Sequence, residues 1–185
     1  MNSIDSHDDN YLIELVKNGN DSAFTFLVSR YKHQVAKTIF GMLGNCAEAD
    51  DVGQETFLRF YKSINNFRGD SRLGTYLTRI AINLSLNELK KRKRKYLFFH
   101  FDNDENHLEI GDVNSDFEKK DTKEIIDMAI KNLTPEFRSV IILRLVNGYS
   151  TKEAAEILNL PIGTVLSRLS RAQIKLKEAL KKLII

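Results

Sequence analysis

Apolar side chains recur every three or four positions along most of the chain, which is the period of an amphipathic α-helix. In the first half this period predicts four helices, over about 9–18, 21–43, 47–65 and 73–95. Gly19, the pair Gly44-Asn45 and the polar stretch 66–72 separate them. The helices of this half are then expected to share one apolar core.

The ends and inner faces of these helices can also be predicted. Asp21 or Ser22 is expected to cap the second helix, because its side-chain oxygen can accept a hydrogen bond from an otherwise unpaired backbone N–H. We expect the third helix to bury five apolar side chains, those of Val52, Phe57, Phe60, Tyr61 and Ile64.

The last third of the chain carries a second group of helices. The pattern predicts them over about 119–132, 135–146, 150–159 and 162–183. Thr134 is placed to cap the helix that Pro135 starts. Ser150 and Glu153 fit a capping box, and Asn159 suits a left-handed turn residue.

The two helices on either side of Asn159 have the pattern of a helix-turn-helix. The first is expected to bury Ala154, Ala155, Ile157 and Leu158 against Val165 and Leu169 of the second. The polar face of the second helix then presents Thr164, Ser167, Arg168, Ser170, Arg171 and Lys175. Such a face fits the DNA major groove, where Arg reads guanine and Ser, Thr and Lys hold phosphates. A plain helical hairpin with a basic surface is the alternative.

Composition supports an all-α protein made of two small helical domains. Its 185 residues include only 9 Gly and 2 Pro, too few for many short strands and tight turns. We find no apolar stretch of about 18 residues and no secretory signal, so we expect a cytoplasmic protein. The single cysteine, Cys46, excludes an intrachain disulfide.

Charge separates the two helical groups. Residues 100–124 carry three basic and nine acidic side chains, whereas the segments before and after them are net basic. We therefore place a first domain, a flexible acidic linker and a second domain at 1–97, 98–118 and 119–185. Clustered basic charge implies an anionic partner such as nucleic acid. Two solvated surfaces on a disordered tether are the alternative.

Every residue from Lys90 to Lys95 is basic. Six cations on fewer than two turns repel each other unless an anion neutralises them, which favours a polyphosphate partner. A solvated helix end, whose cations favour the negative end of the helix dipole, explains the run equally well.

Two segments resemble a known family. Residues 47–94 (AEADDVGQETF…ELKKRKR) resemble the second domain of extracytoplasmic-function sigma factors, and residues 133–180 (LTPEFRSVIIL…KLKEAL) resemble their fourth domain. The segments occur in the family's order, and the resemblance covers about residues 9–182. It implies a non-enzymatic RNA polymerase sigma factor of a stress or envelope response, which binds core RNA polymerase and directs promoter binding, promoter melting and transcription initiation.

The resemblance also implies roles for residues of the first domain. The contact with core polymerase falls on Asp50, Asp51, Gln54, Glu55, Phe57 and Leu58, although Asp50 and Asp51 also suit a helix N-terminus. Recognition and melting of the minus-ten element fall on Phe67, Arg68, Ser71, Arg72, Tyr76, Arg79 and Asn83, followed by phosphate contacts from Lys90, Lys91 and Arg92. Core packing is the alternative for Phe67 and Tyr76.

In the fourth domain the resemblance places recognition of the minus-thirty-five element on Thr164, Ser167, Arg168 and Arg171, a set that we complete with Ser150 and Lys175. Some positions depart from the family: Tyr76 stands where Trp is usual, and Leu166 where Lys is common. The family's promoter sequence is therefore not transferred to this chain.

The resemblance suggests two further partners. The acidic linker, with Asp102, Asp104, Glu105 and Glu109, is expected either to mimic RNA in a basic polymerase channel or to act only as a soluble tether. An anti-sigma factor is expected to bind both domains. Apolar surface around Phe57, Phe60 and Tyr61 would serve that protein or the polymerase.

Three other functions are the alternatives to this one. A stand-alone helix-turn-helix regulator would not need residues 47–95, and an interaction scaffold would need only apolar helix faces. An enzyme is disfavoured because the sequence shows no glycine-rich phosphate loop, no metal-ligand cluster and no nucleophile–base pair. We expect no catalytic residue, cofactor, metal, membrane contact or small-molecule substrate.

Overall fold

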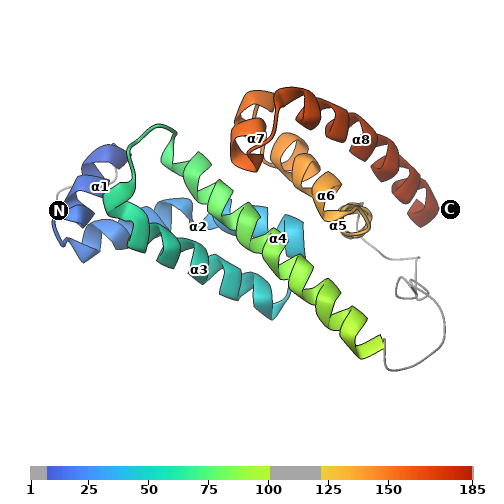
Figure 1. Cartoon of the computed structure of the whole chain (residues 1–185), viewed down its shortest axis with the longest axis horizontal. Helices are drawn as coiled ribbons and strands as arrows, with labels where there is room; N and C mark the ends of the chain where they lie inside the picture. Colours follow the sequence, from blue (N-terminus) through green and yellow to red (C-terminus); the bar gives the residue numbers. More distant parts are fainter. Residues whose placement is uncertain (1–7, 101–121, 185) are drawn as a thin grey trace.

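The computed structural model describes residues 8–100 and 122–184, and all regular structure within them is helical (Figure 1). The N-terminal group consists of α1 (Asp9–Lys17), α2 (Asp21–Leu43), α3 (Ala47–Ser63), the short η2 (Ile64–Asn66) and α4 (Leu73–His100). Most of the expected acidic linker, including Asp102, Asp104, Glu105 and Glu109, lies outside the described residues. None of the described helices has the length and apolar character needed to cross a membrane.

Helices α2, α3 and α4 pack against one another, and α1 lies on α2. Their shared core includes Leu12, Ile39, Phe60, Leu77 and Ile82. The expected core is correct for Phe60, which is 1% exposed, but wrong for Tyr61, which is 43% exposed. Neighbouring residues of a helix point about 100° apart, and Phe60 is the one that continues the inward row of Ala49, Val52 and Thr56.

The cap of α2 also differs from the expectation. Asn20, rather than Asp21 or Ser22, precedes the helix, and its side-chain oxygen accepts a hydrogen bond from the Ala23 N–H at 3.0 Å. The polar run of Asn, Asp and Ser contains three suitable capping residues, so the sequence does not distinguish among them.

The C-terminal group consists of α5 (Thr122–Lys131), α6 (Pro135–Ile141), the π-helical η4 (Ile142–Val146), α7 (Thr151–Leu158) and α8 (Ile162–Ile184). The capping box of Ser150 and Glu153 is present, and Asn159 adopts the left-handed conformation with φ of 52°. Both predictions are confirmed. Thr134 occupies the N-cap position of α6 and Pro135 starts the helix, as expected, but the Thr134 side chain makes no capping hydrogen bond.

The two groups pack against each other through α7 on α4 and through α5, α6 and η4 on α2 (Figure 1). Tyr149 is central to this contact, because its hydroxyl lies 2.6 Å from Gln34 Nε2 and 2.8 Å from Thr78 Oγ1. Nearby, Asn147 donates to Thr38 Oγ1 at 2.9 Å. The interface is therefore held in part by hydrogen bonds between polar side chains.

Glycine allows the helices to come close at this interface. A Cβ atom on Gly41 of α2 would collide with the Ile142 side chain, which is fully buried. Arg138 also crosses the interface and donates to the Met42 carbonyl at the end of α2. That bond satisfies one of the carbonyls that a helix C-terminus leaves unpaired.

Candidate nucleic-acid and polymerase interface

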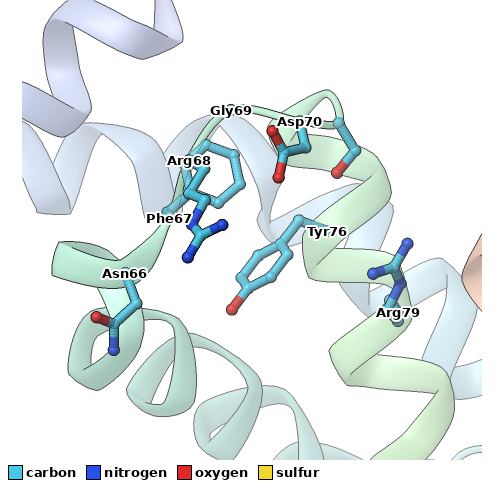
Figure 2. A pocket seen from close by; sticks show the side chains of 8 residues that line it. Asn66, Phe67, Arg68, Gly69, Asp70, Tyr76 and Arg79 are labelled. Carbon is cyan, nitrogen blue, oxygen red and sulfur yellow. The ribbon is translucent and has the colours of Figure 1, made fainter.

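The loop between η2 and α4 forms one wall of a pocket of about 270 Å³. Figure 2 shows Phe67, Arg68 and Tyr76 around this hollow, with α4 supplying Tyr76 from its first turn. Gly69 has a φ of +76°, a conformation in which L side chains are strained, so glycine lets the loop turn there. The complete lining is Asn66, Phe67, Arg68, Gly69, Asp70, Ser71, Tyr76 and Arg79.

Aromatic rings form the floor of this pocket and also pack on the bundle core. The rings of Phe67 and Tyr76 meet edge to face with centroids 5.1 Å apart. The buried ring of Phe60 lies 6.3 Å from Phe67 and 6.2 Å from Tyr76. The Tyr76 hydroxyl lies 3.0 Å from Ser63 Oγ. The same half-buried rings of Phe67 and Tyr76 pack on the core and line the pocket. Core packing therefore does not exclude a role in the pocket.

The polar residues expected beside these rings divide into two groups. Arg68, Ser71 and Arg79 line the pocket, and the buried Nε of Arg79 has no hydrogen-bond partner within the described structure. Arg72 and Asn83 do not line it. Arg72 lies on a neighbouring hollow, and Asn83 is exposed one turn beyond Arg79.

The hollow that Arg72 lines lies on the other side of Phe67 and is closed by α1 and α2. Asp9 accepts hydrogen bonds there from Arg30, at 2.7 Å, and from the Tyr31 hydroxyl. Burial, followed by the bond to Asp9, raises the pKa of Tyr31 well above its usual value. These contacts join α1 to α2 at the edge of this hollow.

The basic end of α4 is only partly free for an anion. Lys90 and Lys91 are exposed, with Lys91 3.8 Å from Glu88. Arg92 lies 3.2 Å from Glu48 and 3.5 Å from Glu88, and it donates to Cys46 Sγ at 3.0 Å. A phosphate would therefore have to displace these partners to reach Arg92, whereas Lys90 is open.

Helix α3 presents the residues expected to contact polymerase along one exposed side. Asp50, Asp51, Gln54 and Leu58 are exposed, and Asp51, Gln54 and Leu58 follow one another at helical spacing. Glu55 is paired with Arg59 at 2.7 Å. Phe57 is half-buried against the core.

The apolar surface on α3 differs from the expected one. Phe60 is buried and does not contribute to it. The large apolar side chains exposed there are Leu58 and Tyr61, which are 46% and 43% exposed.

Helix α8 is the second helix of the helix-turn-helix, and its outer side faces solvent. Ser167, Arg171 and Lys175 are exposed as expected, whereas Thr164 and Arg168 are half-buried. Ser150 is exposed on the loop before α7, but its hydroxyl is engaged in the capping box.

The prediction of a polar outer face on α8 did not include two apolar residues that are exposed there. Leu166 is 52% and Ile174 is 58% exposed. Both fall outside the inward row of Val165, Leu169, Ala172 and Leu176, and this offset is the signal that would have found them.

Known proteins match both helical groups. Residues 27–95 match the family model of Sigma-70 region 2, and residues 123–176 match that of Sigma-70, region 4. RNA polymerase sigma-H factor of Pseudomonas aeruginosa is 32% identical over 184 residues, which cover 95% of each chain. ECF RNA polymerase sigma factor SigW of Bacillus subtilis is 32% identical over 179 residues, covering 92% of this chain and 96% of SigW.

Solved structures show the same fold. The sigma factor RpoE of Bartonella quintana, in complex with the anti-sigma factor NepR, matches with a TM-score of 0.65 and 25% identity over 85% of this chain and 96% of RpoE. CnrH, in complex with the cytosolic domain of CnrY, has a TM-score of 0.67 at 24% identity over 94% and 97% of the two chains. Together with the two family models and the two relatives, these matches place the chain among the ECF RNA polymerase sigma factors, non-enzymatic proteins that direct RNA polymerase to promoters.

Proposed function

We propose that this sigma factor opens promoters by holding an extruded base in the pocket between the 67–72 loop and α4. Opening a duplex requires a base to leave the stack, at a cost of a few kcal/mol. Stacking on an aromatic side chain returns about 1–3 kcal/mol per base. The observation that carries the proposal is that Phe67 and Tyr76 line a pocket whose rim also holds Arg68 and Arg79.

The rim supplies polar groups for the rest of the nucleotide. Arg68 is exposed and available to a phosphate, and Arg79 has a buried donor without a partner. Lys90 and Lys91 continue the basic surface along α4 toward the upstream duplex. Arg72 and Asn83 lie outside the pocket. We assign them to contacts with the DNA strand on either side of the captured base.

Helix α3 is the proposed contact with core polymerase. Its exposed side combines two carboxylates and an amide with the apolar Leu58. Such a surface complements a partner helix that is basic at its rim and apolar at its centre. Glu55 and Phe57, which are engaged within the domain, support this side of α3 rather than form its centre.

Promoter binding requires the two domains to separate. The minus-ten and minus-thirty-five elements are about 25 base pairs apart, or about 85 Å at about 3.4 Å per base pair. In this structure α7 lies against α4, and we call this packing of the two domains the closed arrangement. In it, the two domains cannot reach both promoter elements at once. The interface is held partly by polar contacts, such as those of Tyr149. We expect such an interface between domains to open readily.

We further propose a first domain at 1–97, a linker at 98–118 and a second domain at 119–185, acting in the cytoplasm in a stress or envelope response. An anti-sigma factor is the proposed inhibitor, since the structural neighbour RpoE was solved in complex with the anti-sigma factor NepR. A partner that binds the closed arrangement would keep the promoter-reading surfaces apart from DNA.

Run-off transcription tests this function directly. The purified full chain is mixed with core RNA polymerase and genomic DNA fragments, and discrete transcripts that depend on the chain are expected. A chain that binds core polymerase but yields no such transcript would contradict the proposal. Lack of binding to core polymerase would instead favour the stand-alone regulator.

A further inference from the structure

Leu166 interrupts the polar outer side of α8. Its side chain is 52% exposed, next to Ser167 and one turn before Ser170, and it is directed away from the buried Val165 and Ala172. An isolated exposed leucine is ordinary on a protein surface. Leu166, however, lies in the second turn of a recognition helix. The N-terminal residues of such a helix contact base edges in the major groove, so Leu166 is placed to contact a base.

The charge of α8 favours DNA as the partner of this helix. No acidic residue occurs in α8 between Ile162 and Lys177, whereas the same stretch carries Arg168, Arg171 and Lys175. At about 100° per residue these three basic side chains lie roughly 140–200° around the helix from Leu166, so they would reach phosphates at one wall of a groove and leave Leu166 nearer the other. An apolar side chain in the major groove has one natural partner there, the 5-methyl group of thymine.

The other exposed apolar residues of α8 are less suited to this role. Ile162 precedes Leu166 by one turn, but it lines the hollow between α7 and α8 together with Leu160 and Pro161. Ile174 lies two turns beyond Leu166, farther from the end of the helix that enters the groove. Leu166 alone combines exposure with an unobstructed place in the second turn.

We propose that Leu166 contacts the methyl group of a thymine in the minus-thirty-five element and so sets the base preference at that position. The inference rests on the proposed promoter-reading role of α8 and adds to it one residue and one base. A cytosine at the same position lacks the methyl group, and a guanine there would find no hydrogen-bond partner on leucine.

Deoxyuridine provides the test, because it removes the methyl group and leaves base pairing unchanged. Holoenzyme assembled from core polymerase and the full chain is assayed for open-complex formation on a promoter that it transcribes. Each thymine of the minus-thirty-five element is replaced in turn. We expect one replacement to lower open-complex formation about fourfold, the factor for one buried methyl-sized group.

Two variants connect that effect to Leu166. Leu166→Ala should be insensitive to the same deoxyuridine, and Leu166→Lys should shift the preference at that position toward guanine, which lysine can read. The matched control is Ile174→Ala, which removes a similarly exposed apolar side chain from the same helix and should keep the wild-type sensitivity.

The proposal is overturned if no deoxyuridine affects the wild-type holoenzyme, if Leu166→Ala keeps the full sensitivity, or if the transcribed promoters lack thymine in this element. An effect of Leu166→Ala confined to inhibition by a protein partner would also overturn it. The proposed function fails separately, when the holoenzyme transcribes no promoter at all.

Discussion

The two surfaces proposed to bind DNA in this sigma factor are built in different ways. In the region 2 pocket, Phe67 and Tyr76 contact the buried Phe60, so the residues that line the site also complete the core. In region 4, Val165 and Ala172 anchor α8 to the core, whereas Ser167, Arg171 and Lys175 on the outer side of the helix are exposed. Substitutions should therefore change stability and function together in the pocket, and function alone on α8.

The largest effect is expected from Phe60→Ala. Removing this fully buried ring should lower the free energy of unfolding by about 3–5 kcal/mol and remove the support of both pocket rings. Chemical denaturation of the full chain measures the loss. Leu58→Ala, two residues earlier and 46% exposed, is the control: its stability should change by less than about 0.5 kcal/mol while binding to core polymerase weakens. Equal destabilisation by both variants would contradict the assigned faces of α3.

Tyr76→Ala should follow in size. Loss of the ring is expected to reduce promoter opening by the holoenzyme by about 1–3 kcal/mol, the value of one base–aromatic stack. Permanganate reactivity of unpaired thymines measures the opening. Tyr76→Phe keeps the ring and loses the contact with Ser63, so it should retain opening with a stability loss of about 1 kcal/mol. If the Phe variant fails as the Ala variant does, stacking is not the role of Tyr76.

Tyr149→Phe should loosen the contact between the two domains. It removes the hydroxyl that lies within hydrogen-bond distance of Gln34 and Thr78, a change of about 1 kcal/mol, and increases the open fraction about fivefold. Small-angle X-ray scattering should show a larger radius of gyration. Tyr76→Phe is a matched control, because it loses a hydroxyl contact within one domain and should leave the radius unchanged.

The smallest effect concerns the capping box before α7. Ser150→Ala should cost about 1 kcal/mol of stability.

Hydrogen bonds from the Ser150 backbone N–H and then its side chain hold the pKa of Glu153 below its usual range. The stabilisation is therefore present above the ordinary pKa of a glutamate, about 4.5, and is lost as the pH falls through the lower pKa of the folded state.

Thermal unfolding between about pH 3 and pH 6 measures this pH-dependent stabilisation by Glu153. Glu153→Gln keeps a hydrogen-bond acceptor at this position but does not titrate, so the difference in stability between wild type and variant should shrink as the pH falls. A difference that stays constant over this range would contradict the assignment.

Much of the fold could be predicted from local signals. Apolar periodicity located the helices, and the capping box with Asn159 located the turn of the helix-turn-helix. The choice between Phe60 and Tyr61 could not be made, because adjacent aromatic residues both fit a period of three or four. The contact of Tyr149 with Gln34 joins residues 115 positions apart, which no local pattern reports.

The site was predicted less completely than the fold. Loop 66–72 and its aromatic residues were found, but the sequence could not show that Arg79 lines the pocket while Arg72 lies in the next hollow. Leu166 was noted only as a departure from the family's Lys, and its 52% exposure on α8 was not predicted. Resemblance to a family gives residue types at matched positions, whereas exposure depends on the packing of this chain.

Whether the pocket holds an extruded base can be measured by the fluorescence of 2-aminopurine, a base analogue whose emission rises when it leaves the stack. The probe is placed at successive positions of the minus-ten element in a promoter bound by the holoenzyme. We expect one position to report a base that has left the stack and is held by the pocket, with a signal that Tyr76→Ala changes. Open complexes that form with no such position, or with a signal that Tyr76→Ala leaves unchanged, would contradict it.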